Sequence, residues 1–224
     1  MSIQDMPKTI QNYLMTKMNR DEKEYRDNRI SVTDLCGCLR KAYFKRREPA
    51  PITLEQAFTF NRGILFDEEY TSLFPRNQVR VTHRISNYPI VITGRLDFID
   101  EDGAVADWKT IDGTYWIEQK GAKEENITQV LFYAYCEGLD KARLYYMSLG
   151  NLIKVDVDAD DKTQLENMEK LEDRALELYE NLCCNSPPER DDVHTKKYWE
   201  CEYKKSGNTV RCEYYDKCYG DKNE

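Results

Sequence analysis

The chain has 224 residues, 33% of them charged, with a formal net charge of −8 at pH 7. This length allows one large domain or one domain with an appendage. No run of about 18 apolar residues occurs, which excludes an evident membrane span. The polar segment 1–29 lacks the apolar centre of a signal peptide, so we expect a cytoplasmic protein.

The negative net charge argues against a nucleic-acid partner, but two local stretches of the chain are basic. Residues 40–47 hold five cations and no acid, and residues 70–96 hold arginines and no acid. Phosphate binding depends on such local patches, although each stretch could equally be an ordinary solvated face. Eight cysteines in a cytoplasmic chain favour metal ligation or an iron–sulfur cluster over disulfides.

Helical and strand patterns follow one another along the chain. The first half predicts helices over 6–20, 31–47 and 53–74, then strands over 78–85, 89–99 and 104–109. The pattern Ser31-x-x-Asp34 is typical of a capping box that opens the second helix. The second half predicts a helix over 114–138 that Gly121 could break, strands over 142–149 and 152–157, and a helix over 162–183.

The last predicted helix carries one apolar stripe, formed by Leu165, Met168, Leu171, Ala175, Leu178 and Leu182. The polar tail after about residue 189 has too few aliphatic residues to fold alone, so it needs a cross-link or must pack on the rest. The order of elements predicts an α/β fold with a mixed central sheet flanked by helices. We divide it into an N-terminal helical segment (1–48), a core (53–160) and a C-terminal helix with its tail (161–224).

Two acids and a lysine lie on neighbouring predicted strands. With the turn centred on Asp102, Asp97 and Asp107 stand opposite one another on one face of a hairpin, and Lys109 shares that face. Such carboxylates suit Mg²⁺ or Mn²⁺, which would activate a water, while Lys109 would position or help deprotonate it. The alternative is a surface hairpin with scattered acids.

Two helical motifs accompany the hairpin. Gln129 and Tyr133 lie four residues apart on the helix after the third strand, and Asp67 lies four residues after Gly63 on the helix before the first strand. Together with the hairpin, this ordered set resembles the PD-(D/E)XK nuclease superfamily, in particular its RecB-like branch. The resemblance implies a restriction-endonuclease-like core.

The same resemblance implies roles for individual residues. It implies metal ligands at Asp67, Asp97 and Asp107, and catalytic roles for Asp97, Asp107, Lys109, Gln129 and Tyr133. RecB-like nucleases usually have histidine where Asp67 stands, but a carboxylate can also bind the metal. Glu68 is the reserve candidate.

The segment around Cys38 resembles the N-terminal signature of the CRISPR-associated "Cas four" exonucleases, in which a cysteine leads into a basic, aromatic helix. The resemblance implies a 4Fe–4S cluster that joins the two ends of the chain, held by Cys38, Cys201, Cys212 and Cys218. Leucine replaces the usual proline after Cys38, and ten residues separate Cys201 from Cys212 where the family usually has two. Structural Zn²⁺ or no metal are the alternatives, and Cys36 could replace Cys38.

These resemblances imply a Mg²⁺- or Mn²⁺-dependent DNA nuclease, acting as an exonuclease on single-stranded ends. Expected phosphate contacts are Arg40, Lys41, Arg46 and Arg95. CRISPR adaptation proteins or phage replication and recombination proteins are the expected partner classes. Two alternatives remain: a non-cleaving DNA-binding partner in CRISPR spacer acquisition, and a cluster-bearing redox or structural protein whose acids are incidental.

Overall fold

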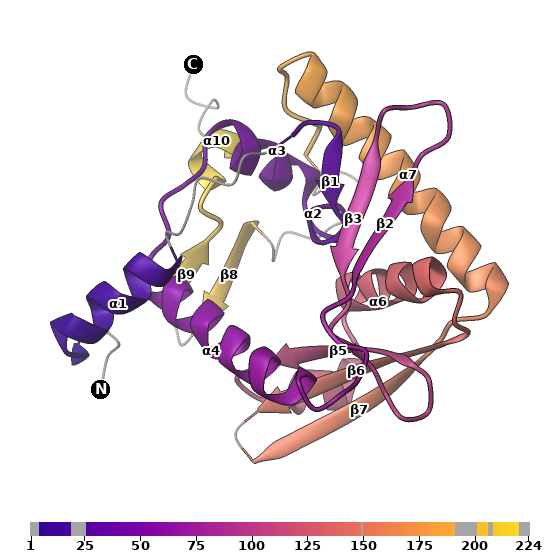
Figure 1. The fold of residues 1–224 in the computed structure, drawn as a ribbon. Coiled ribbons are helices and arrows are strands. Elements are labelled where there is room, and N and C mark those ends of the chain that lie inside the picture. Colours follow the sequence, from indigo (N-terminus) through magenta and orange to yellow (C-terminus); the bar gives the residue numbers. More distant parts are fainter. Residues whose placement is uncertain (1–4, 19–25, 149, 191–200, 206–207, 220–224) are drawn as a thin grey trace.

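The computed structural model of the protein describes residues 5–18, 26–148, 150–190, 201–205 and 208–219. Two β-sheets form its centre, and helices pack around them (Figure 1). None of the described helices is long and apolar enough to cross a membrane. The α/β prediction, with mixed sheet and flanking helices, is confirmed.

The N-terminal helices differ from the prediction in one respect. Helix α1 (Lys8–Met18) is present, but the helix expected over 31–47 is two helices, α2 (Val32–Cys36) and α3 (Leu39–Arg47). Ser31 makes no side-chain cap on α2, so the predicted capping box is wrong. Instead Cys38 caps α3, because its Sγ accepts a hydrogen bond from the amide of Lys41 at 3.5 Å.

Helix α4 (Leu54–Thr71) is long and lies beside α1 (Figure 1). It begins with a true capping box: the Thr53 hydroxyl accepts from the Gln56 amide, and the Gln56 side chain accepts from the Thr53 amide. The capping box stabilises the first turn of α4. From there α4 extends from the α1 side of the molecule to the edge of the second sheet (Figure 1).

The first sheet has three strands in the order β1-β3-β2. Strand β1 (Arg29–Ser31) runs parallel to β3 (Val91–Arg95), and β2 (Arg80–Arg84) is antiparallel to β3. The sequence analysis did not predict the short strand β1. One face of the sheet is mainly apolar and is covered by helix α6 (Glu124–Glu137).

The second sheet has four strands in the order β4-β5-β6-β7. It contains β4 (Phe98–Ile99), β5 (Val105–Thr110), β6 (Lys141–Ser148) and β7 (Asn151–Asp158). Only the β5–β6 pair is parallel, so the sheet is mixed as predicted. The strand predicted over 89–99 is therefore two strands, β3 and β4, which belong to different sheets.

The β5–β6 crossover consists of α5 (Tyr115–Lys120) and α6, which are separated at Gly121 as the sequence suggested. Helix α7 (Asp161–Cys183) packs on α6 and α3. Its predicted apolar stripe is buried except at Leu165, which is 53% exposed because it lies off the packed face.

The C-terminal part folds back onto the N-terminal helices. Hairpin β8 (Glu202–Lys205) and β9 (Asn208–Arg211) leads into α10 (Tyr215–Tyr219), which lies next to α3 (Figure 1). The Tyr214 ring stacks on Phe44 with centroids 5.7 Å apart, and its hydroxyl accepts a hydrogen bond from the Ala50 amide at 3.0 Å. The tail thus packs on the rest of the chain, as its composition required.

Candidate active site

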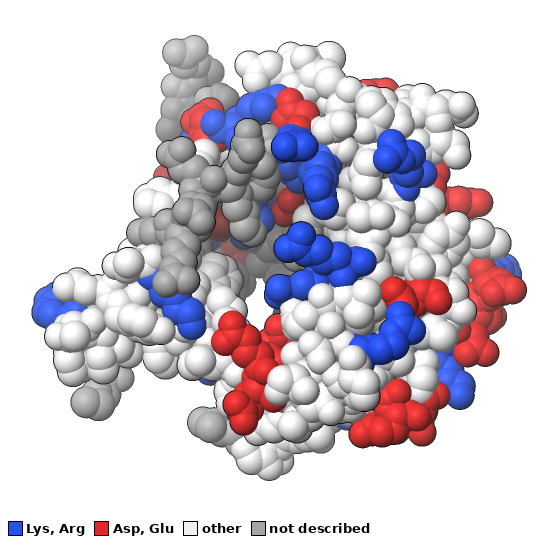
Figure 2. All heavy atoms as spheres, viewed as in Figure 1, with Lys and Arg blue, Asp and Glu red and all other residues white. Residues whose placement is uncertain are grey.

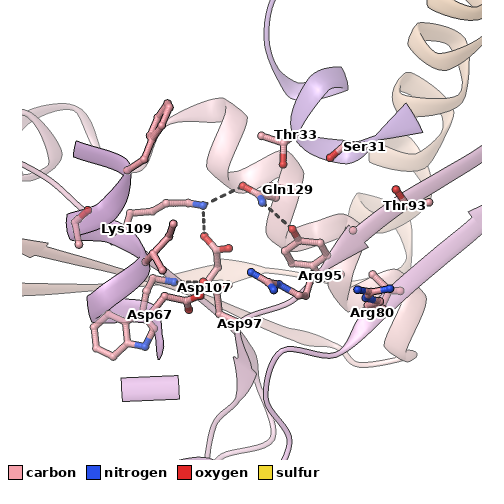
Figure 3. A pocket seen from close by; sticks show the side chains of 18 of the residues that line it. Ser31, Thr33, Asp67, Arg80, Thr93, Arg95, Asp97, Asp107, Lys109 and Gln129 are labelled. Atoms are coloured by element: carbon pink, nitrogen blue, oxygen red, sulfur yellow. Dashed lines mark hydrogen bonds and ion pairs between the residues drawn. The ribbon is translucent and has the colours of Figure 1, made fainter. Parts of the chain in front are cut away.

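A cavity of about 890 Å³ lies between α4 and the two sheets. Figure 2 shows a hollow at the centre of this face, with Lys and Arg side chains on one side and Asp and Glu on its lower rim. The residues of the acid hairpin and of both helical motifs line this cavity (Figure 3).

The two hairpin carboxylates come together as the turn symmetry predicts. Phe98 pairs with Ala106 and Ile99 with Val105, so Asp97 and Asp107 occupy the next opposed positions. Asp97 Oδ2 accepts a hydrogen bond from the Trp108 amide at 2.8 Å, which fixes it against β5. Asp107 is 2% exposed. The hairpin therefore holds one buried and one largely buried carboxylate at the cavity floor.

Lys109 connects the carboxylates to helix α6. Its Nζ lies 2.5 Å from Asp107 Oδ2 and donates a 3.0 Å hydrogen bond to Gln129 Oε1. Gln129 Nε2 in turn donates to the Tyr133 hydroxyl at 2.7 Å. Four predicted site residues thus form one chain of polar contacts, which holds the ammonium group in a defined place (Figure 3).

Asp67 reaches the same cavity from α4. Its Oδ2 accepts a 2.9 Å hydrogen bond from Gln78 Nε2, whereas its buried Oδ1 has no hydrogen-bond partner among the described residues. Glu68 is exposed and does not line the cavity. Asp67 is therefore the acid of α4 that is placed to act with the hairpin.

Burial and neighbouring negative charge raise the proton affinity of Asp97 and Asp67. Burial raises the pKa of Asp97 well above its usual value, and the charges of Asp107 and Asp67 raise it further. Burial also raises the pKa of Asp67. Burial lowers the pKa of Lys109, but the Asp107 carboxylate outweighs this and raises it, so the amine is held as an ammonium.

This donor set suits a hard divalent cation. Mg²⁺ is commonly held by one or two carboxylates, with water and substrate phosphate completing its octahedron. Asp97 and Asp107 supply such a pair, and the free oxygen of Asp67 lies on the same cavity. Within the described parts of the chain, no three His, Cys, Asp or Glu side chains already form a complete ligand cluster.

The basic residues expected to bind phosphate divide into two groups. Arg95 is exposed and lines the cavity. Arg46 does not line the cavity. Its side chain is 2% exposed and pairs with Asp34 at 2.9 Å, so the structure contradicts the phosphate contact expected for this residue. Arg40 donates to the Pro188 carbonyl and Lys41 pairs with Glu213, and neither lines the cavity. The basic stretch of α3 therefore holds the fold together.

Sequence reasoning missed several residues at or beside the cavity. Gln78 orients Asp67 but does not itself line the cavity, and it belongs to no sequence motif. Arg80 and Thr82 on β2, and Thr93 on β3, line the cavity. The alternation of these polar residues with buried ones was the signal that could have found them.

The four cysteines of the expected cluster lie on elements that meet. Cys38 caps α3, the Cys212 amide donates to the Cys201 carbonyl at 2.8 Å, and Cys218 lies on α10 beside α3 (Figure 1). These thiols do not form a ready ligand set in the described structure. Cys36 packs instead against the core, and burial raises its pKa to about 12.

The comparisons agree with this geometry. The family model described as the PD-(D/E)XK nuclease superfamily matches residues 5–219, so the chain belongs to that superfamily. Among curated proteins no match was found.

The solved structures with a similar fold include two with TM-scores above 0.5. SSO0001 is 18% identical with a TM-score of 0.56, over 83% of this chain and 90% of that protein. A phage-related exonuclease from Haemophilus somnus 129PT is 13% identical with a TM-score of 0.52, over 70% of this chain and 96% of that protein. At these identities the similarity concerns the fold alone.

Proposed function

We propose that this protein is a Mg²⁺- or Mn²⁺-dependent deoxyribonuclease that hydrolyses phosphodiester bonds. One observation carries the proposal: Asp67, Asp97, Asp107 and Lys109 reach one cavity from three different elements, in a chain of the PD-(D/E)XK superfamily. Nothing in the packing of the fold requires three acids to share a partly buried site, and their mutual repulsion costs stability.

Each residue has a distinct part in the proposed reaction. Asp97 and Asp107 would hold the cation, with Asp67 as a further ligand, and the bound metal supplies an activated water and charge stabilisation. Lys109 offsets the negative charge that develops on the phosphoryl oxygens. Gln129 fixes the lysine through its 3.0 Å contact, and Tyr133 fixes Gln129. Tyr133 stays a neutral phenol, because burial raises its pKa.

We propose single-stranded DNA ends as the substrate. The Haemophilus protein with a similar fold is described as an exonuclease, which supports this choice. The CRISPR adaptation and phage replication or recombination settings remain proposals of the same kind, and a non-cleaving DNA-binding partner is the alternative.

A cleavage assay tests the function. We expect the wild-type protein to shorten end-labelled single-stranded DNA in Mn²⁺, and Asp107→Ala to lose at least about 100-fold in rate. Asp158→Ala removes an exposed aspartate of β7 and serves as the matched control. Binding without cleavage by the wild type would establish the non-cleaving alternative, and equal cleavage by wild type and Asp107→Ala would refute the assigned site.

We also propose that Cys38, Cys201, Cys212 and Cys218 take up a 4Fe–4S cluster, with Zn²⁺ as the weaker alternative. The support is that α3 and the C-terminal segment pack together, with Lys41 of α3 paired to Glu213 at 3.1 Å. Anaerobic purification should give a brown protein with visible absorbance and bound iron. Cys218→Ser should lose both, whereas Cys184→Ser, at the exposed residue that follows α7, should not. Bound zinc in place of iron would establish the alternative.

A further inference from the structure

The three-stranded sheet places its polar side chains on one face. In the β1–β3 and β2–β3 registers, Arg80 lies beside Arg95, Thr82 and Ser31 lie beside Thr93, and Arg84 and Arg29 lie beside Val91. Residues paired in this way share a face, and the intervening residues point to the other. The face is thus an arginine row, a hydroxyl row and a second arginine row.

No described carboxylate forms an ion pair with an arginine of this face, although Asp67 interacts electrostatically with Arg95. Arg29, Arg80, Arg84 and Arg95 are all exposed, and none makes an ion pair with a described acid. The cations of α3 differ sharply, because Lys41, Lys45, Arg46 and Arg47 each pair with an acid. Four unpaired guanidinium groups on one sheet face repel one another, so an anionic ligand would relieve a real electrostatic cost.

The face leads directly to the catalytic carboxylates. Arg95 and Asp97 are two residues apart, and Figure 3 shows Arg80, Arg95, Thr93 and Ser31 around the cavity that Asp97 enters. The Arg80–Arg95 row and the Arg29–Arg84 row are four residues apart on β3, roughly 13 Å at about 3.3 Å per residue. The face is therefore long enough for more than one nucleotide.

Helices α1 and α4 contribute apolar side chains to the cavity, next to Thr59 and Asp67. These are Met18 of α1 and Phe60, Ile64 and Phe66 of α4. Phe60 is 53% exposed, although aromatic side chains gain from burial. A cavity with arginines and hydroxyls on one wall and an aromatic ring on the other matches a ligand with a charged edge and a flat apolar edge.

We propose that the β1-β3-β2 face binds the phosphate backbone of single-stranded DNA on one side of the scissile bond, with the bases turned toward Phe60. This inference rests on the proposed function and adds the strand's path and orientation. A single strand exposes both its phosphates and the faces of its bases, whereas a duplex keeps its base faces stacked inside. Arg29, Arg80, Arg84 and Arg95 are phosphate contacts, and Phe60 is a stacking contact.

The double variant Arg29→Gln/Arg84→Gln tests the backbone contacts, because these residues lie far from the reacting atoms. Binding of fluorescent (dT)₂₀ is measured by anisotropy in the full-length chain carrying Asp107→Asn, which prevents cleavage. Each phosphate contact changes the slope of log K against log salt by about 0.7 for single strands. We expect binding about 25-fold weaker at 0.1 M salt and a slope reduced by about 1.4.

Lys162→Gln/Lys170→Gln is the matched control. It removes two exposed cations from α7, which packs on α6 on the other side of the sheet. We expect its salt slope to equal that of the parent. The proposal is overturned if Arg29→Gln/Arg84→Gln binds as tightly as the parent, or if the control loses as much affinity.

Hydrolysis of the p-nitrophenyl ester of thymidine 5′-phosphate separates the two proposals. With Asp107 intact, Arg29→Gln/Arg84→Gln should cleave this small ester at the wild-type rate but show a raised KM for (dT)₂₀. If the wild type cleaves neither substrate, the proposed function fails while the binding result stands on its own. If the variant loses activity on both substrates equally, the backbone assignment fails.

Phe60→Ala tests the orientation of the strand. Base stacking on an aromatic side chain is worth about 5- to 150-fold in affinity per base. We expect Phe60→Ala to weaken binding of (dT)₂₀ within this range and to leave binding of an abasic 20-mer unchanged. Equal losses on both oligonucleotides, or tighter binding of duplex than of single-stranded DNA by the parent, would overturn the orientation.

Discussion

Gly94 shows how a single residue shapes the active site. A Cβ at this position would lie 2.5 Å from Cε1 of Tyr133 and 3.2 Å from Cε1 of Phe132. Helix α6 can therefore approach β3 only because residue 94 has no side chain. This close approach is what brings Gln129 and Tyr133 to Lys109.

We predict that Gly94→Ala destabilises the protein and displaces Tyr133. Overpacking a buried contact costs about 1–3 kcal/mol, because neither Tyr133 nor Phe132 can leave the core cheaply. Denaturant unfolding measures this loss. Gly113→Ala is the control, since a Cβ there meets nothing within 4 Å. Equal stability of the two variants would show that α6 moves freely.

A second prediction for a single residue concerns Asp97. Burial raises its pKa, and the charges of Asp107 and Asp67 raise it further. Asn can keep the hydrogen bond from the Trp108 amide without the charge. We expect Asp97→Asn to raise the melting temperature of the metal-free protein while losing about 100-fold in cleavage.

The sign of the pH effect follows from the raised pKa. A folded-state pKa above the unfolded value means that the wild type loses stability as pH rises between the two values. The advantage of Asp97→Asn should therefore grow with pH in EDTA-containing buffer. A variant less stable than wild type at every pH would show that the carboxylate is favourable without metal.

The sequence predicted individual site residues correctly where local backbone geometry determines which side chains lie together. The Asp97–Asp107 pairing follows from the turn, because hairpin loops set strand register. Arg46 was misassigned because its partner Asp34 lies on a separate helix, and only the break at Gly37 brings the two together. No local pattern reports such a tertiary contact.

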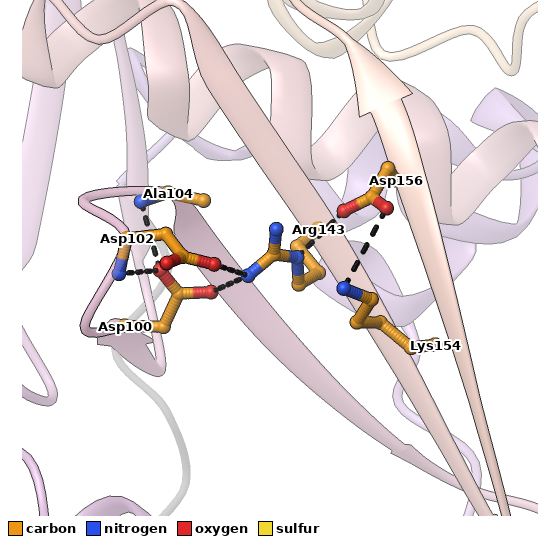
Figure 4. Close-up of polar contacts among 6 residues, drawn as sticks. All are labelled: Asp100, Asp102, Ala104, Arg143, Lys154 and Asp156. Atoms are coloured by element: carbon orange, nitrogen blue, oxygen red, sulfur yellow. Dashed lines mark hydrogen bonds and ion pairs between the residues drawn. The ribbon is translucent and has the colours of Figure 1, made fainter.

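At the scale of elements, Arg143 of β6 joins the β4–β5 turn to strand β7 (Figure 4). Its guanidinium contacts Asp100 and Asp102 of the β4–β5 turn, and Asp156 of β7 at 2.7 Å. The Asp100 side chain is 1% exposed and also accepts the amides of Asp102 and Ala104 at 3.0 Å each. Asp100 therefore sets the turn that aligns Asp97 with Asp107.

We predict that Arg143→Ala costs about 3 kcal/mol, because removing one partner leaves a buried carboxylate uncompensated. Lys154→Ala, which breaks only an exposed contact to Asp156, should cost less than about 0.5 kcal/mol. Urea unfolding distinguishes the two. Adding Asp100→Asn to Arg143→Ala should restore part of the loss, and no restoration would mean that the cost is mainly lost packing.

Helices and strands were predicted best where their hydrophobic pattern extends over many residues. Helix α7 and the β6–β7 hairpin appear within a residue or two of expectation. Strand β1 has three residues, too few for period-two alternation to be seen, and its pairing partner β3 lies about 60 residues away. The arginine face of the sheet therefore needed the structure, although the alternation within β2 and β3 was visible in the sequence.

At the scale of the whole molecule, the C-terminal segment packs on helix α3 and the residues that follow it. Tyr214 is only 3% exposed, and its ring stacks on Phe44. Lys41 pairs with Glu213, and Lys217 pairs with Glu48. The surface ion pairs contribute little, since exposed pairs are worth about 0–1 kcal/mol. The buried tyrosine is the main described contact that holds α10 on α3.

We predict that Tyr214→Ala releases the C-terminal segment. Truncating a buried aromatic residue costs about 3–5 kcal/mol, whereas Tyr214→Phe loses only the hydrogen bond to the Ala50 amide, about 1 kcal/mol. Limited trypsin digestion should therefore cleave near Arg211 or Lys217 faster in Tyr214→Ala than in Tyr214→Phe. If iron-loaded Tyr214→Ala stays as resistant as the wild type, a cluster holds the ends together more strongly than the tyrosine does. Equal resistance of the iron-free variants would instead show that packing at residue 214 does not hold the tail.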